Sequence, residues 1–232
     1  MCHCCGVRSA FQSLSICTQC FCAVEALPFS GCARCGRKTC AGACGELAVF
    51  SSVSCLFTYA RPLSTLLLQA KNDQCEEGQQ AFRDLFFLRV QRALGGLILR
   101  HGVERVVLAP LRIARLFALE WHPHCLFLEA LEGLRAQGYA FEIDLPLKAA
   151  WVRQASRAAS TRRSEASRPV YQPPCLAPLA RLKGGVLVVD DVLTSGQTAL
   201  ALASTKTPRG TSGHRQGPFH LFALLRTPVD TP

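Results

Sequence analysis

The stretch GVLVVDDVLTSGQTAL, residues 185–200, constrains the fold of this chain more than any other segment. Four consecutive apolar residues, 186–189, run directly into Asp190 and Asp191. A strand that is apolar on both faces must be covered on both faces, which is typical of the inner strands of a parallel sheet. Because a short hydroxyl-and-glycine turn follows the two acids, we expect this strand to end at a polar site.

Other apolar segments predict strands that alternate with helices. We expect strands over 53–60, 105–111, 141–147, 185–191 and 219–227, and helices over 61–71, 79–100, 124–137 and 198–204. This alternation predicts an α/β fold with a mostly parallel sheet flanked by helices. Ligands of such sheets bind beyond the carboxyl ends of the strands, where Asp190 and Asp191 are expected to lie.

The first 48 residues hold ten of the fourteen cysteines. A Cys-x-x-Cys turn aims two thiolates at one ion, and two such turns complete a tetrahedral zinc shell. Four pairs therefore predict a double zinc ribbon with two structural zinc sites, whose ligands are Cys2, Cys5, Cys17, Cys20, Cys32, Cys35, Cys40 and Cys44. Cys4, Cys22 and His3 are alternative ligands, and a core of free thiols is the remaining alternative.

The concentration of cysteines in the first 48 residues also predicts a domain boundary. We expect residues 1–48 to form the zinc-ribbon module and residues 49–232 the α/β domain. Residues 1–20 lack the apolar core of a signal peptide, and no run of 18 apolar residues predicts a membrane span. We therefore expect a cytoplasmic protein whose clustered thiols bind metal instead of forming disulfides.

The formal net charge of +10 favours phosphates, nucleotides or nucleic acid as partners. Residues 148–184 carry eight basic residues, one acidic residue and four prolines, which predicts a mobile basic loop. An alternative function follows from this charge: a non-catalytic adaptor that binds single-stranded nucleic acid through the zinc ribbon and the basic loop. Only Trp151 and Tyr171 in the loop offer rings for base stacking.

The residues after the buried strand suit a phosphorylated sugar. Two neighbouring carboxylates accept hydrogen bonds from ribose hydroxyls and hold Mg2+ through water. The turn supplies hydroxyls and backbone N–H groups for a phosphate monoester. We therefore predict a phosphoribosyl site formed by Asp190, Asp191, Val192, Leu193, Thr194, Ser195, Gly196, Gln197 and Thr198.

This segment resembles the fingerprint of the type I phosphoribosyltransferases, a hydrophobic strand followed by two acids and a T-[ST]-G-x-T turn. Two further segments extend the likeness: Y-A-R-P-L-S-T-L from Tyr59 to Leu66, followed by Lys71, and A-P-L-R-I-A-R from Ala109 to Arg115. Together with the four cysteine pairs, they are similar to the ComF/GntX family, in which a double zinc ribbon precedes a phosphoribosyltransferase domain.

The resemblance implies binding of 5-phosphoribosyl-1-pyrophosphate with Mg2+ and transfer of its phosphoribosyl group. It implies that Asp190 and Asp191 are the catalytic pair on the ribose, that residues 192–198 hold the 5′-phosphate, and that the pyrophosphate ligands are Lys71, Arg112 and Arg115. Family members are linked to DNA uptake in natural transformation, so protein partners in DNA uptake or a role in nucleotide-related metabolism are also implied.

The chain departs from the family pattern around the expected pyrophosphate. The family's R-G-F-N-Q segment corresponds to E-W-H-P-H from Glu120 to His124, and Glu165 lies near the place of an expected asparagine. Catalytic turnover and the acceptor substrate therefore stay open at the level of sequence.

Overall fold

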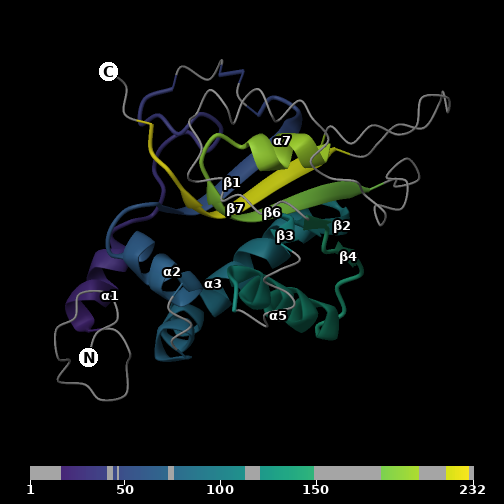
Figure 1. Ribbon diagram of the computed structural model, residues 1–232. Coiled ribbons are helices and arrows are strands. Elements are labelled where there is room, and N and C mark those ends of the chain that lie inside the picture. The colour runs from purple at the N-terminus through teal and green to yellow at the C-terminus, as the bar shows by residue number, and fades with distance from the viewer. Residues whose placement is uncertain are drawn as a thin grey trace, which may run out of the picture.

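The computed structural model describes residues 17–40, 44–45, 47–72, 76–112, 121–148, 184–203 and 218–229. Its centre is a parallel sheet with helices on both faces (Figure 1). The strands lie in the order β1–β7–β6–β2–β4, with the bounds Phe50–Thr58, Phe219–Arg226, Gly185–Leu193, Val103–Leu108 and Glu142–Asp144. All four pairings in this sheet are parallel, which confirms the predicted α/β class.

The central strand β6 is buried on both faces, as its uninterrupted apolar run predicts. Leu187 and Val189 belong to one core cluster, and Val186 and Val188 belong to the other. The helices that cover the larger cluster are α2 (Leu63–Asn72), α3 (Glu76–His101) and α5 (Pro123–Ala136), whereas α7 (Gln197–Ala203) covers the smaller one. Burying one such aliphatic side chain stabilises the fold by about 1.5–3 kcal/mol.

Two of the predicted strands are divided in the structure. The segment 105–111 forms β2 and then β3 (Leu111–Arg112), and the segment 141–147 forms β4 and then β5 (Leu147–Lys148). The strands β3 and β5 pair with each other in a separate two-stranded sheet. Pro110 and Pro146 stand at the two divisions, and because proline has no N–H group to donate to a ladder, the main strands end before them.

The strand β6 is longer than predicted. It continues to Leu193, which pairs with Arg226 on β7, so Val192 and Leu193 belong to the strand and the turn begins only at Thr194. Asp190 and Asp191 are therefore successive strand residues, whose side chains leave the sheet on opposite faces.

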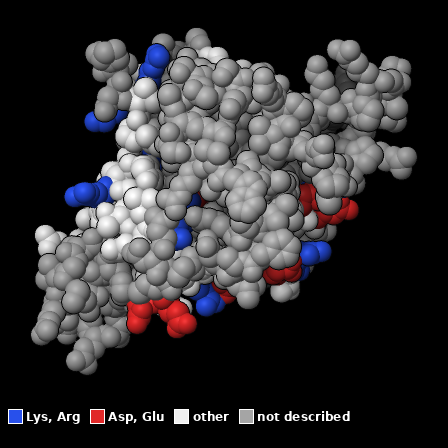
Figure 2. All heavy atoms as spheres, in the orientation of Figure 1, with Lys and Arg blue, Asp and Glu red and all other residues white. Residues whose placement is uncertain are grey.

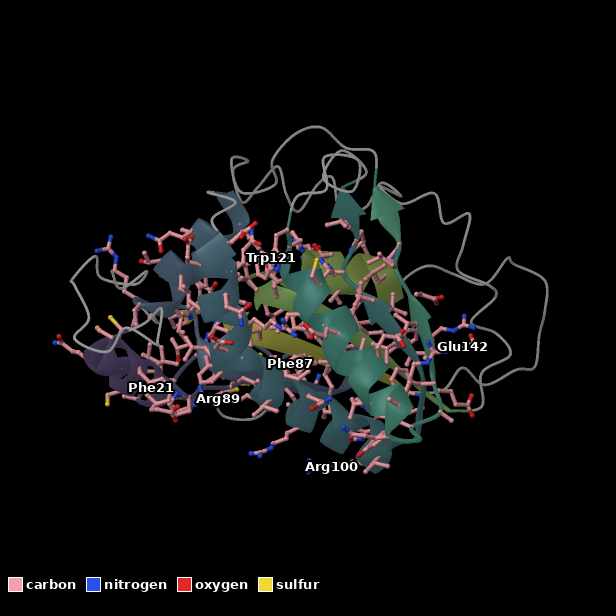
Figure 3. The ribbon with its side chains drawn as sticks, turned by 90° about the horizontal axis from the view of Figure 1, so that it is seen from below. Phe21, Phe87, Arg89, Arg100, Trp121 and Glu142 are labelled. Atoms are coloured by element: carbon pink, nitrogen blue, oxygen red, sulfur yellow. The ribbon has the colours of Figure 1, made fainter. Side chains whose placement is uncertain are left out.

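The described part of the cysteine-rich head contains a helix that the sequence did not predict. This helix, α1 (Thr18–Glu25), contributes the fully buried Val24 to the larger core cluster. Arg89 of α3 lies beside this helix (Figure 3). It forms an ion pair with Glu25, and its guanidinium lies 5.6 Å from the ring centroid of Phe57. The helical part of the head thus packs against the α/β core, while a domain boundary at residue 48 stays a prediction.

Basic and acidic side chains both occur on the face shown in Figure 2, and the coloured residues form no single basic patch there. The predicted basic loop falls almost wholly outside the described residues: Lys148 lies in β5 instead of the loop, and Gly184 directly precedes β6. The nucleic-acid alternative therefore stays a prediction. None of the described helices is long and apolar enough to cross a membrane.

A buried histidine lies at the opposite end of the sheet from the two acids. His220 at the start of β7 stacks on His101 at the end of α3, with ring centroids 4.0 Å apart. Its Nδ1 lies 2.8 Å from the Ser52 hydroxyl oxygen. Burial, together with the neighbouring His101, lowers the pKa of His220 below its ordinary value.

We predict that this histidine makes folding stability depend on pH. The unfolded chain takes up a proton near pH 6.5, which the folded chain resists, so the free energy of unfolding should fall as pH is lowered below about 6.5. Urea unfolding between pH 7 and pH 5 measures the slope, and His220→Gln should reduce it. Comparing the two chains separates this histidine from the carboxyl groups, and equal slopes would contradict the assignment.

Candidate functional site

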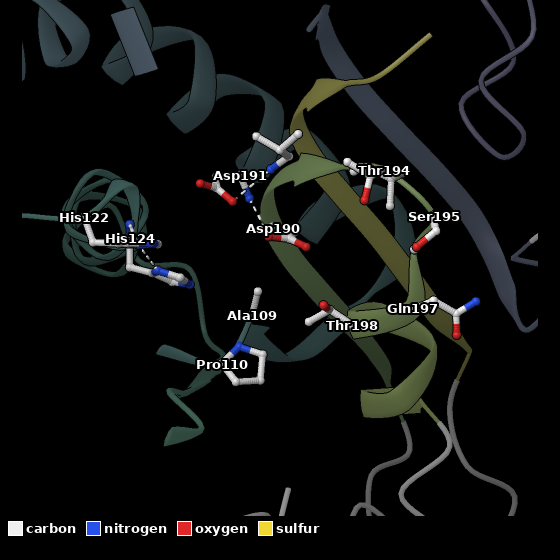
Figure 4. Close-up of a pocket in the computed structure, with 13 residues that line it drawn as sticks. Ala109, Pro110, His122, His124, Asp190, Asp191, Thr194, Ser195, Gln197 and Thr198 are labelled. Atoms are coloured by element: carbon white, nitrogen blue, oxygen red, sulfur yellow. Dashed lines mark hydrogen bonds between the residues drawn. The ribbon is translucent and has the colours of Figure 1, made fainter. Parts of the chain in front are cut away.

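A cavity of about 300 Å³ lies at the carboxyl end of β6 (Figure 4). Its lining consists of Ala109, Pro110, His122, His124 and every residue from Asp190 to Thr198. The residues that the sequence predicted for the phosphoribosyl site therefore line one cavity. The cavity also lies where ligands of parallel sheets bind, beyond the carboxyl ends of neighbouring strands.

The two aspartates of this cavity have different partners. Asp191 is 7% exposed and forms an ion pair with Lys71 of α2. The Asp191 N–H donates to the Asp190 carboxyl at 2.9 Å, and the Val192 N–H donates to the Asp191 carboxyl at the same distance. In Figure 4 the Asp191 carboxyl points toward the histidine side of the cavity and that of Asp190 toward the turn.

These surroundings shift the pKa values of the two carboxyl groups in opposite directions. Burial raises the pKa of Asp190 well above its ordinary value, and the charge of Asp191 raises it further. Burial also acts to raise the pKa of Asp191, but Lys71 and, after it, His122 hold that pKa below its usual range. The pair thus combines a firmly ionised carboxylate with a carboxyl group that protonates readily, an asymmetry that is typical of functional sites.

The turn beyond β6 presents its polar groups to the cavity. Gly196 has a φ of 72°, a conformation that glycine adopts without strain. Thr194 and Ser195 are exposed, and the backbone N–H groups of residues 195–198 donate to no main-chain carbonyl within the described part of the chain. Successive N–H groups in such a turn form a concave site that favours anions.

Arg226 anchors this turn from behind. Its buried guanidinium donates from Nη1 to the Leu193 carbonyl at 2.8 Å and to the Thr194 carbonyl. The Thr227 N–H adds a second bond to the Leu193 carbonyl at 3.1 Å. From the sequence alone this arginine is only part of a predicted strand, because a strand pattern does not reveal which neighbour a terminal side chain reaches.

Two histidines line the cavity on the side opposite the turn (Figure 4). His122 is the N-cap residue of α5, and its side chain accepts a hydrogen bond from the His124 N–H at 3.4 Å. The two rings stack with centroids 4.4 Å apart. In the sequence this segment stands out only as a departure from the family pattern. The signal that could have identified them is the pair of histidines flanking Pro123, the first residue of the helix.

The structure shows a partner for one of the three predicted pyrophosphate ligands, while their role in binding pyrophosphate stays a prediction. Lys71 is not a lining residue of the cavity, but its ammonium pairs with the lining residue Asp191 and is the counter-ion of that buried carboxylate. Arg112 is the second residue of β3, two positions after the cavity residue Pro110. Arg115 lies outside the described residues.

Four of the predicted metal ligands come together in a second candidate site. The Sγ atoms of Cys32, Cys35, Cys40 and Cys44 all lie within 4.8 Å of one another. A tetrahedral zinc ion with Zn–S bonds of about 2.3 Å holds its sulfurs about 3.8 Å apart. The Cys32 and Cys44 sulfurs are 3.6 Å apart, so the four thiols can hold a structural zinc ion after small adjustments.

The backbone around Cys32 also suits a bound cation. The Gly36 N–H donates to the Cys32 carbonyl at 2.7 Å and closes a tight turn, in which Gly36 has a φ of 81°. The pKa of Cys32 is lowered to about 6, chiefly because the Cys35 N–H donates to the sulfur; burial opposes this effect and the Arg34 N–H assists it. Because zinc binds thiolates, these N–H groups favour metal binding.

Of the other four predicted zinc ligands, Cys17 and Cys20 lie in the described part of the chain. Cys2 and Cys5, together with the alternative ligands His3 and Cys4, lie outside the described residues. Cys17 is the N-cap residue of α1, where its sulfur accepts a hydrogen bond from the Cys20 N–H at 3.4 Å. A second zinc site in the cysteine-rich head stays a prediction.

No protein-family model matches the sequence, and no curated protein matches it significantly. The likeness to the ComF/GntX family thus rests on the quoted motifs.

We predict that Cys35→Ser lowers the zinc content by one ion per chain, because three thiolates no longer complete the tetrahedral shell. Mass spectrometry of the metal after dialysis against metal-free buffer measures the stoichiometry. The matched control is Cys55→Ser, which removes a thiol from β1 outside the cluster and should leave the zinc content unchanged. Equal zinc in the parent and Cys35→Ser would contradict a metal site at the cluster.

We also predict that Lys71→Met destabilises the fold by about 3 kcal/mol at pH 7, because it leaves the buried Asp191 carboxylate without its cation. Adding Asp191→Asn should recover part of this loss, since the stranded charge is then removed. Urea unfolding of the two single variants and the double variant completes the cycle. Additive losses would show that the two side chains do not interact.

Proposed function

We propose that this protein binds 5-phosphoribosyl-1-pyrophosphate in the cavity at the end of β6 and transfers its phosphoribosyl group. The observation that carries this proposal is that the acid pair Asp190–Asp191 and the turn 194–198 line one cavity without interruption. The motif likeness to the ComF/GntX family supports the same ligand.

In this proposal the turn holds the 5′-phosphate. Its backbone N–H groups and the hydroxyls of Thr194, Ser195 and Thr198 suit the oxygens of a phosphate monoester. Asp190 points toward the turn, so its carboxyl group is placed for the ribose hydroxyls of the same ligand (Figure 4). A phosphate and a sugar are therefore held by residues that follow one another in the chain.

The charges of the site suit the other end of the ligand. Lys71 keeps Asp191 ionised inside the protein and places a cation beside the cavity for the anionic pyrophosphate. The ionised Asp191 and its neighbour Asp190 offer carboxylate oxygens of the kind that Mg2+ takes, directly or through water. When bound, Mg2+ would neutralise charge on the pyrophosphate as it leaves.

The histidine pair supplies a proton acceptor. During transfer the bond from C1 to the pyrophosphate oxygen breaks, a bond from C1 to the acceptor forms, and the acceptor loses a proton. His122 and His124 lie across the cavity from the turn, away from the proposed 5′-phosphate position (Figure 4). An imidazole on that side, once it is in its neutral form, is placed to take the proton from an incoming amine or hydroxyl.

The proposal predicts that 5-phosphoribosyl-1-pyrophosphate with Mg2+ stabilises the folded chain. At a concentration 100-fold above the dissociation constant, a ligand adds about 2.7 kcal/mol. For a chain of this length the melting temperature should therefore rise by about 5–10 °C. Asp190→Asn combined with Asp191→Asn should abolish the shift in a thermal titration, because both carboxylates of the site are lost.

Matched controls make this titration specific. Glu104→Gln combined with Glu132→Gln removes two carboxylates from the amino end of β2 and the later part of α5, away from the cavity, and should keep the shift. Ribose 5-phosphate lacks the pyrophosphate and should stabilise the chain less. The proposal fails if the parent chain shows no shift with 5-phosphoribosyl-1-pyrophosphate and Mg2+.

A further inference from the structure

The Arg226 guanidinium joins the cysteine cluster to the cavity turn. Nη2 donates to the Arg34 carbonyl at 3.0 Å, and Nη1 donates to the carbonyls of Leu193 and Thr194. The Arg226 side chain is only 3% exposed, so water does not compete strongly for these bonds. Arg34 itself lies between Cys32 and Cys35, inside the metal-binding turn. One buried side chain therefore connects two segments that serve different sites.

A second contact reaches the turn from the other end of the cluster. The Arg34 side chain donates to the carbonyls of Leu47 and Phe50, each at 2.7 Å, and so holds the segment that follows Cys44. The buried Leu47 side chain lies directly against Gly196, because a Cβ atom at Gly196 would fall 2.4 Å from Leu47 Cδ2. The segment that follows Cys44 thus limits the position of Gly196 in the turn.

A third contact passes through the chain after β7. The Val229 N–H donates to the Gly36 carbonyl at 3.1 Å, and the Thr227 N–H donates to the Leu193 carbonyl at 3.1 Å. A Cβ atom at Gly36 would lie 3.0 Å from the Thr227 carbonyl oxygen. The residues after Arg226 are therefore packed between the metal-binding turn and the end of β6.

Metal binding would change the charge of the cysteine cluster next to these contacts. A zinc ion with four thiolate ligands carries a net charge of about −2, whereas four protonated thiols are neutral. Arg34 lies within the cluster segment and Arg226 is bonded to its carbonyl, so both cations would gain a nearby negative charge when the metal binds. Burial of a cation is costly without such compensation, and metal binding should therefore hold both arginines in place.

We propose that Arg226 and Leu47 are positioning residues through which metal binding at Cys32, Cys35, Cys40 and Cys44 orders the turn 194–198 for the phosphate of its ligand. Zinc and the phosphorylated ligand are then coupled positively, and by linkage each raises the affinity for the other by the same factor. The inference rests on the proposed function only for the identity of the ligand.

The first experiment does not involve the ligand. Amide hydrogen exchange is compared between the zinc-loaded chain and the chain stripped with a chelator. Zinc removal should speed exchange in residues 194–200 by about tenfold or more, while the amides of β2 change by less than about twofold. If amide exchange in β2 rises equally, the stripped chain has lost its fold. The zinc-loaded variants of the second experiment then test whether the cluster orders the turn.

The second experiment alters the contacts between the cysteine cluster and the turn while zinc stays bound. Arg226→Lys keeps the charge but cannot bridge three carbonyls, and Leu47→Ala removes the contact at Gly196. With zinc content unchanged, each should speed exchange in the turn and weaken 5-phosphoribosyl-1-pyrophosphate binding about tenfold. The matched control is Arg105→Lys, which changes another buried arginine. Arg105 lies on β2 and pairs with Glu142 and Asp144 of β4. This variant should leave amide exchange in the turn and ligand affinity within about twofold of the parent.

These outcomes separate the inference from the proposed function. Turn exchange that is unchanged in zinc-loaded Arg226→Lys and Leu47→Ala would overturn the inference. Faster turn exchange in both variants, with no 5-phosphoribosyl-1-pyrophosphate binding in any form of the chain, would support the metal-to-turn connection and refute the ligand.

Discussion

The burial of β6 on both faces is the constraint on which the rest of the structure depends. Valine and leucine side chains of residues 186–189 alternate between two core clusters, so a shift of one residue along the strand would exchange the two sets. Because the register is fixed in this way, Asp190 and Asp191 have defined positions near the carboxyl end of β6. Asp191 meets Lys71 on one side of the strand, and Asp190 faces the turn.

The same arrangement explains how two neighbouring carboxyl groups acquire different properties. Side chains of successive strand residues point to opposite faces and therefore meet different surroundings. Lys71 and His122 stabilise the ionised form of Asp191, and the resulting negative charge disfavours ionisation of Asp190. The asymmetry of the site thus follows from the pleat of the strand and from which helices cover each face.

Local patterns were enough to predict much of this protein. Hydrophobic period predicted the strand of residues 186–189, and helix-start chemistry predicted the helix over 124–137, which the structure begins at Pro123. Ligand spacing predicted that Cys32, Cys35, Cys40 and Cys44 bind metal, but it did not predict that these four thiols come together. The errors were the missed helix α1 and the boundaries of several strands. Pro110 and Pro146 divided two expected strands, and pairing with β7 carried β6 on to Leu193, because neighbouring strands decide where a ladder ends.

The sequence by itself determined the α/β class, the acids at the end of a buried strand and the clustered thiols, since each depends on residues that are close together in the chain. Only the tertiary structure decided that Lys71 neutralises Asp191, that His122 and His124 face the turn, and that Arg226 bonds to Arg34, 192 positions away. Such contacts depend on the order of strands and on the faces that helices cover. No local periodicity encodes them, because they arise only when distant segments share one core.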